Sequence, residues 1–199
     1  MNKGIEEKIK NVFYQNNGYA KTKDIVNADI HKKYLKELLD EGIIYKLKRG
    51  LYKWREYDFS NEIVDVAKIV PGGIICLVSA LSYYGLTTYT PLEYQVAIYQ
   101  KSKVVLPDYP PINIYYFSKE YYETGIKKIN MDGNTIKIYN IEKTISDCFR
   151  FNNEIPKDVL LESIKEYVRK RDKNINKLMK YARNTSAEKQ ISKYLEVLV

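Results

Sequence analysis

Hydrophobic residues in the first 55 positions repeat at helical spacing and then at strand spacing. A recurrence every three or four residues predicts a first helix over residues 3–15. The residues at this spacing are Ile5, Ile9, Val12 and Phe13. A turn over residues 16–18, Asn-Asn-Gly, ends the predicted helix.

Two shorter helices are predicted next. Thr22 is placed to cap a helix over residues 22–27. Asp29 is placed to cap a third helix over residues 30–41, and Gly42 stands where a left-handed residue commonly ends a helix.

Two β-like runs close this N-terminal pattern. They cover residues 43–48 and 51–54 and meet at Arg49-Gly50, which predicts a hairpin with glycine in its turn. The order helix, helix, turn, helix, hairpin is that of a winged helix-turn-helix. The helix over residues 30–41 then has the position of the recognition helix.

The predicted recognition helix has an apolar stripe and a basic end. Leu35, Leu38 and Leu39 form the stripe. The N-terminal part of a recognition helix reaches base edges in the major groove, so the basic residues there are candidate DNA-reading residues. They are His31, Lys32, Lys33 and Lys36. The hairpin adds residues suited to phosphate contact or minor-groove insertion, which are Lys46, Lys48, Arg49 and Lys53.

These basic residues also have structural interpretations. A lysine face can simply be solvated, and His31 can be a satisfied surface or core-edge residue. Some winged helices contact proteins and not DNA. A cluster of like charges is mildly self-repulsive, which favours a partner of opposite charge.

The remainder of the chain mixes helix-like and strand-like segments. Helices are predicted over residues 61–70 (capped by Ser60), 79–84, 156–170, 174–183 and 186–198, and a further helix begins at Asn140 or Thr144 and runs through Phe151. Strands are predicted over residues 94–99, 112–117, 126–131 and 135–139, with Asp132-Gly133 joining the last two as a hairpin.

The predicted fold class is α+β: an N-terminal winged helix-turn-helix followed by a mixed α/β C-terminal domain ending in helices. We place the boundary in the polar stretch Arg55–Ser60. Residues 1–55 then form a DNA-binding domain and residues 56–199 an α+β domain. Within the latter, residues 56–155 hold helices plus a small sheet and residues 156–199 form a basic helical end.

Charge is distributed unevenly along the 199 residues. The net charge is +8 overall, made up of +6 in residues 1–55, −3 in residues 56–155 and +5 in residues 156–199. Two basic blocks therefore flank a mildly acidic middle. This asymmetry suggests a polyanionic partner for the basic ends.

Three blocks of sequence resemble the AbiEi family of antitoxin-regulators. The first runs from Gly18 to Trp54 and includes LKELLDEGIIYKLKRGLY. The second, Pro71–Leu86, is similar to the family signature PGG-x-I-x-x-x-SAL-x-x-x-GL, and the third, Glu142–Phe149, is similar to its EKTI-x-D-C segment. The blocks stand in the family's order, and the resemblance spans residues 18–170.

The resemblance implies a cytoplasmic antitoxin of a toxin–antitoxin operon linked to abortive phage infection. Such a protein represses its own operon through the winged helix, by binding inverted repeats in the promoter. It counters a nucleotidyltransferase-like toxin, and the C-terminal domain is associated with that neutralisation. Double-stranded DNA, the toxin and a second copy of the chain on DNA are thus the expected partners.

Few residues are suited to catalysis or metal binding. The single histidine, His31, and the two cysteines, Cys76 and Cys148, exclude a Cys/His zinc cluster and a disulfide framework. Buried structural roles are expected for both cysteines. We therefore expect no enzyme activity, no cofactor and no metal. A metal-dependent nuclease site assembled by folding remains the minor alternative.

Composition adds two further expectations. A mean hydropathy of −0.45 and the absence of an apolar run of about 18 residues argue against a membrane span. Tyrosine is frequent, with 20 residues against five Phe, and it concentrates in the strand-rich middle. Because tyrosine suits interfaces as well as core edges, the competing function is a protein-interaction module that binds the toxin directly.

Overall fold

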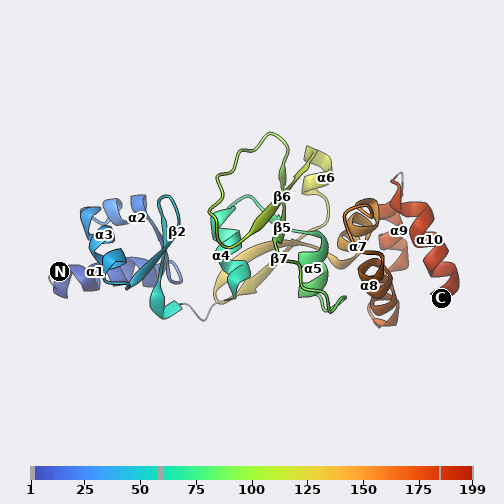
Figure 1. Cartoon of the computed structure of the whole chain (residues 1–199), viewed down its shortest axis with the longest axis horizontal. Helices are drawn as coiled ribbons and strands as arrows, with labels where there is room; N and C mark the ends of the chain where they lie inside the picture. Colours follow the sequence, from blue (N-terminus) through green and yellow to red (C-terminus); the bar gives the residue numbers. More distant parts are fainter. Residues whose placement is uncertain (1–2, 58–60, 184, 199) are drawn as a thin grey trace. The chain divides into compact units, whose positions relative to one another are not determined.

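Ten α-helices and two β-sheets make up the part of the chain that this computed structural model describes, residues 3–57, 61–183 and 185–198 (Figure 1). The fold class is α+β. The helices are α1 (Lys3–Gln15), α2 (Thr22–Asn27), α3 (Lys33–Asp40), α4 (Glu62–Ile69), α5 (Leu77–Tyr83), α6 (Lys119–Glu123), α7 (Ile141–Arg150), α8 (Lys157–Arg169), α9 (Ile175–Ala182) and α10 (Ala187–Leu198). The strands are β1 (Tyr19–Lys21), β2 (Ile44–Lys48), β3 (Leu51–Trp54), β4 (Ile74–Ile75), β5 (Tyr94–Tyr99), β6 (Ile112–Phe117), β7 (Ile126–Met131) and β8 (Asn134–Tyr139).

The chain forms two compact units. Unit 1 consists of Met1–Pro71 with Val104–Pro110 and Asn130–Ile136. Unit 2 consists of Gly72–Lys103, Pro111–Ile129 and Lys137–Val199. Helix α4 therefore belongs to the same unit as the N-terminal helices.

The core of unit 1 lies between helices α1 to α3 and a small antiparallel sheet. Helix α1 contributes Ile9 and Phe13, α3 contributes Leu35 and Leu38, and β3 contributes Trp54. The rings of Phe13 and Trp54 meet edge to face with their centroids 5.3 Å apart. Burying an apolar side chain of this size contributes about 1.5–3 kcal/mol, so these contacts hold the short elements together.

The small sheet has the strand order β1-β3-β2 and two chemically different faces. Because successive side chains of a strand point to opposite faces, Ala20 and Trp54 lie on the core side. Tyr19 and Lys53, which are directly paired across β1 and β3, lie on the other side. Strand β1 is too short to show alternation and was not predicted.

Gly18 occupies a place that no other residue fits without rearrangement. Its φ of +89° lies in the left-handed region, and a Cβ added there would stand 2.3 Å from Cγ of Tyr57. The turn after α1 therefore depends on glycine for both its backbone conformation and its close approach to Tyr57.

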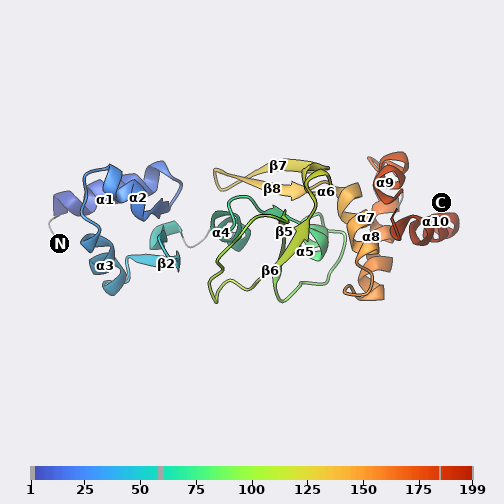
Figure 2. The ribbon, with the colours of Figure 1, turned by 90° about the horizontal axis from the view of Figure 1, so that it is seen from above.

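The second sheet has five strands in the order β6-β5-β4-β8-β7, and Figure 2 labels β5 to β8 of this sheet. It is mixed, because β5 pairs in parallel with β6 and β4 in parallel with β8, whereas β4 and β5 are antiparallel. The predicted Asp132-Gly133 turn joins β7 to β8, and both residues have positive φ, +50° and +72°. A two-residue turn with positive φ at both central positions is the tight hairpin turn expected for Asp-Gly.

Helix α7 is the centre of the helical part of unit 2. It contacts α5, α8, α9 and α10, and the C-terminal helices α8 to α10 gather around it, coloured orange to red in Figure 1. Its residues 142–149 are all buried, so the helix is enclosed on every side. Its N-cap is Asn140, whose side-chain oxygen accepts a hydrogen bond from the backbone N–H of Lys143 at 3.0 Å.

Several predicted boundaries need correction. Helix α3 begins at Lys33 and not at residue 30, because Asp29 has a φ of +57° and lies in the turn. Helix α5 begins two residues earlier than predicted, and β4 and α6 were not predicted. The predicted cap Ser60 lies outside the described residues, and Asn61 caps α4 by accepting a hydrogen bond from the N–H of Ile63.

The bounds of the predicted helix 3–15, helix 22–27 and strands 94–99, 112–117 and 126–131 are confirmed, but the N-cap of helix 22–27 is Lys21 and not Thr22. No helix in the described part of the chain combines the length and apolar character that crossing a membrane requires.

Candidate nucleic-acid interface

The start of α3 brings four of the predicted residues together on one exposed surface. Leu35 and Leu38 face the core of unit 1. His31, Lys32, Lys33 and Lys36 are all exposed. The apolar stripe of α3 thus directs the basic residues of its first turns away from the core, as the helical spacing predicts.

Local contacts order this end of α3. The side chain Nδ1 of His31 accepts a hydrogen bond from the backbone N–H of Lys33 at 3.1 Å, which satisfies one free donor of the first helical turn. The ammonium of Lys33 lies over the ring of Tyr34, 4.9 Å from its centroid. Lys32 and Lys36 are one helical turn apart and point to solvent on the same side.

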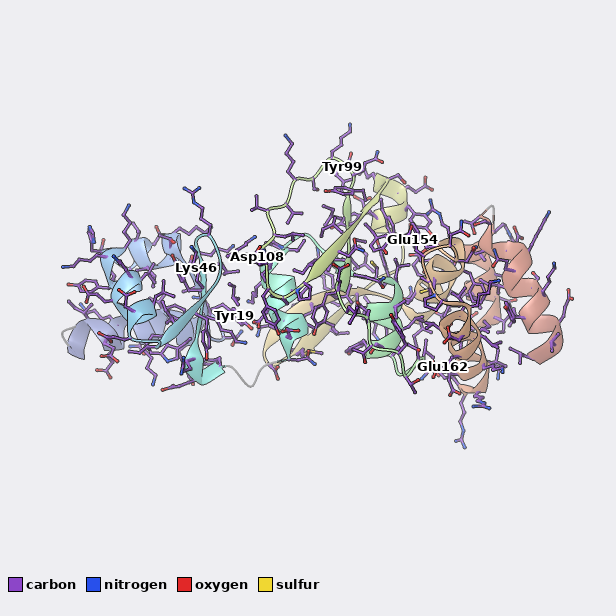
Figure 3. The ribbon with its side chains drawn as sticks, in the orientation of Figure 1. Tyr19, Lys46, Tyr99, Asp108, Glu154 and Glu162 are labelled. Atoms are coloured by element: carbon purple, nitrogen blue, oxygen red, sulfur yellow. The ribbon has the colours of Figure 1, made fainter. Side chains whose placement is uncertain are left out.

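The β2–β3 hairpin exposes two of its four candidate residues. Lys46 and Arg49 are exposed, and Figure 3 shows Lys46 on this hairpin. No carboxylate of the described residues forms an ion pair with either side chain. They are therefore free to approach a polyanion.

Lys53 does not share this surface, in contrast to its predicted role. It is 2% exposed, and its Nζ lies 3.0 Å from Oδ2 of Asp65 on α4. The hydroxyl of Tyr19 donates a hydrogen bond to the other carboxylate oxygen of Asp65 at 2.6 Å. Lys53 is thus an internal charge neutralised by Asp65 of α4, and it does not lie on the surface that exposes Lys46 and Arg49.

Lys48 is half-buried and turned toward α4 as well. Its ammonium donates a hydrogen bond to the backbone carbonyl of Ile69, at the C-terminal end of α4. Burial lowers the pKa of Lys48, and the nearby Lys21 lowers it further. Of the hairpin lysines, Lys46 therefore lies in solvent, whereas Lys48 and Lys53 contact α4.

A second charged cluster, which the sequence did not reveal, lies in the core of unit 2. Nζ of Lys143 lies 2.6 Å from Oδ1 of Asp147, one turn further along α7, and both side chains are buried. The hydroxyl of Tyr121 donates a hydrogen bond to the same carboxylate. The ammonium also lies 3.4 Å from the centroid of the Tyr121 ring and 4.7 Å from that of Tyr139.

Burial changes the acid–base behaviour of this cluster. It raises the pKa of Asp147 and lowers the pKa of Lys143, because a low-polarity environment disfavours both charged forms. The mutual attraction of the pair and the aromatic rings around the ammonium oppose this effect. Both residues lie in the EKTISDC segment, where they are four residues apart.

Most tyrosines of the middle region have structural contacts. The Tyr115 hydroxyl donates to Glu154 at 3.1 Å, that of Tyr139 donates to the carbonyl of Tyr122 at 2.9 Å, and that of Tyr84 donates to the carbonyl of Tyr139 at 2.9 Å. Tyr116, by contrast, is 59% exposed on β6. The tyrosine excess therefore mainly reflects core edges with satisfied hydroxyls.

The cysteines are buried and reduced. Burial raises the pKa of both the Cys76 and the Cys148 thiols, so neither thiol ionises readily. In the described ranges, no three or more His, Cys, Asp or Glu side chains gather in a way that could hold a metal ion.

Comparison with known proteins adds a likeness of fold. No protein-family model matches the chain, and no curated protein matches its sequence. Among solved structures, the chain is similar to the crystal structure of the RV2827C protein from Mycobacterium tuberculosis, with a TM-score of 0.72 and 11% sequence identity. The likeness covers 97% of this chain and 76% of that one, so the two proteins share a fold over almost the whole of this chain.

Proposed function

We propose that residues 3–57 act as a winged helix-turn-helix that binds double-stranded DNA. The element order α1-β1-α2-α3-β2-β3 supports this proposal, since α2 and α3 follow one another through a short turn and the β2–β3 hairpin follows α3. In this proposal α3 is the recognition helix and the hairpin is the wing.

The observation that carries the proposal is the exposed basic start of α3. His31, Lys32, Lys33 and Lys36 present donors from one end of a helix whose opposite face is buried. Lysine can donate to the acceptor atoms of guanine in the major groove or to phosphates. Lys46 and Arg49 on the wing would bind the backbone, which fixes the register of the helix in the groove.

We further propose that this DNA is the promoter of the protein's own operon and that the protein acts as an antitoxin. The support is the resemblance of three sequence blocks to the AbiEi family. The bound sites would be inverted repeats, each half occupied by one copy of the chain. The toxin countered would be nucleotidyltransferase-like, encoded beside this protein.

A gel-shift experiment with the promoter fragment tests the DNA site. The Lys32→Ala/Lys33→Ala/Lys36→Ala variant should lose most of its affinity, because each lost phosphate or base contact weakens binding. A variant with three exposed lysines changed elsewhere, Lys8→Ala/Lys157→Ala/Lys165→Ala, is the matched control for net charge. Equal affinities of the two variants would contradict the site.

A further inference from the structure

Three lysines from three different elements of unit 1 surround one end of the small sheet. The strand register pairs Leu51 with Lys21 on one side and with Lys48 on the other. Residues directly opposite one another in a sheet project to the same face, so both lysines flank Leu51 on the face that α4 covers. Lys68 reaches this face from α4, with its ammonium 5.0 Å from the centroid of the Tyr19 ring.

This face contains more positive charge than the structure neutralises. Asp65 of α4 pairs with Lys53, as described above. Within the described residues, Lys21, Lys48 and Lys68 form no ion pair with a carboxylate. The nearby Asp24 directs its carboxylate to the backbone N–H of Lys21, at 2.8 Å.

The ammonium group of Lys21 repels those of Lys48 and Lys68. The charge of Lys21 lowers the pKa of both Lys48 and Lys68, in addition to the effect of their partial burial. A charge that is partly buried and unpaired is costly, and the cost falls when an anion binds beside it. The cluster of Lys21, Lys48 and Lys68 therefore lowers the stability of unit 1 when no anion is bound.

A hollow adjoins this cluster. Its volume is about 350 Å³, and its charged lining residues are Lys21, Lys23, Lys68 and one carboxylate, Asp24, with Asn16, Asn134 and Thr135 among the neutral polar ones. Leu51, Val64, Ala67 and Pro71 are among its apolar lining residues. Apolar walls reduce the local dielectric screening, so a charge–charge interaction in the hollow is stronger than on an open surface.

We propose that this hollow binds a phosphate group, held by Lys21 and Lys68 with Lys48 adding to the positive potential. Several ammonium donors around one small site suit a multiply charged oxyanion, and lysine is a common phosphate ligand. Two sources have this chemistry: a backbone phosphate of bound DNA, and a free phosphorylated small molecule. The first source rests on the proposed DNA-binding function and the second does not.

Calorimetric titration of the full chain with inorganic phosphate, without DNA, tests the site itself. The parent should bind phosphate saturably. Lys21→Gln/Lys68→Gln should bind it at least about tenfold more weakly, since hydrogen bonds to charged groups are lost. Lys8→Gln/Lys165→Gln removes the same charge from exposed positions outside the hollow and should bind like the parent. Failure of the parent to bind, or equal weakening in both variants, would overturn the proposal.

The salt dependence of DNA binding distinguishes the two sources. If the hollow takes a DNA phosphate, Lys21→Gln/Lys68→Gln should reduce the slope of log K against log salt by about 0.9 for the lost phosphate. If it takes a free phosphorylated molecule, the slope should stay unchanged while phosphate titration still shows the loss. If the parent chain binds no DNA, the proposed function is wrong. The phosphate titration alone would then test whether the hollow binds phosphate.

Discussion

Lys53 of β3 and Asp65 of α4 form a buried ion pair, with 3.0 Å between Nζ and Oδ2. The pair joins the small sheet to a helix that follows it in the chain. The Tyr19 hydroxyl donates a hydrogen bond to the other oxygen of the Asp65 carboxylate. Because of this pair, Lys53 of the hairpin is buried and not exposed to solvent.

Removing the carboxylate of this pair should destabilise unit 1. Asp65→Asn leaves Lys53 as an uncompensated buried charge, and we expect the free energy of unfolding to fall by about 3 kcal/mol. The double variant Lys53→Met/Asp65→Asn removes both charges and keeps an acceptor for Tyr19. It should recover most of that loss in urea unfolding, and a double variant as unstable as the single one would contradict the pair's role.

Two glycines of unit 1 allow a matched test of close packing. Gly18 and Gly50 both have positive φ, +89° and +77°, so alanine strains the backbone at either position. That strain costs about 1–2 kcal/mol. Only at Gly18 would the new Cβ also meet a ring, that of Tyr57, so Gly18→Ala should cost clearly more than Gly50→Ala. Thermal unfolding of the two variants measures the difference, and equal losses would be inconsistent with this packing.

The proposed DNA-binding function predicts different contributions from the β2–β3 hairpin and from α3. Lys46→Ala/Arg49→Ala should weaken binding to all sequences alike and reduce the salt slope by about 1.8, for two phosphate contacts. The α3 triple variant should in addition lose discrimination between the promoter and unrelated DNA. Fluorescence anisotropy at several salt concentrations separates the two, and a sequence-selective loss in the wing variant would argue against this division.

High pH should unfold unit 2 because its buried acidic groups stay protonated in the folded state. Burial raises the pKa of six tyrosines above the ordinary value of 10.0: Tyr84, Tyr115, Tyr121, Tyr122, Tyr139 and Tyr167. Above pH 10.0 the unfolded chain then binds fewer protons than the folded chain, and stability falls as pH rises.

Lys143 acts in the opposite direction. Burial lowers its pKa, so it favours folding as pH rises toward 10.5, but the six tyrosines outnumber this one lysine of unit 2. Ionisation of these six tyrosines, followed by tyrosinate absorbance against the matching Tyr→Phe variants, should therefore coincide with the loss of the circular dichroism signal. Ionisation of these six near pH 10 in a still-folded chain would contradict this expectation.

Helices and strands were predicted correctly from the sequence where the hydrophobic repeat extended over several residues. The helix over residues 3–15 and the strands over 94–99, 112–117 and 126–131 are such cases. It failed for β1 and β4, which span three and two residues and are strands only because neighbouring strands pair with them. It also placed the start of α3 too early, since Asp29 takes a turn conformation instead of a cap.

The charged residues show a second limit of sequence patterns. Lys46 and Lys53 look alike as hairpin lysines, yet one is exposed and the other faces α4, which lies beyond the hairpin in the chain. Lys143 and Asp147 have the spacing of a solvated helical pair, but α5, α8, α9 and α10 pack against their helix, and rings from β6, α6 and β8 surround the ammonium. Whether a lysine side chain is exposed or buried depends on the tertiary packing, so the local sequence pattern could not predict it.

The enclosure of α7 has a practical meaning for anyone who wishes to shorten this protein. Helices α9 and α10 both pack on α7, which carries the Lys143–Asp147 pair on an interior face. Deleting them would open that pair and the surrounding aromatic rings to water rather than release a separable module. Loss of function in such a truncated chain would therefore report unfolding of unit 2 before it reported the removal of functional residues, and point substitutions at exposed positions are the cleaner way to find those residues.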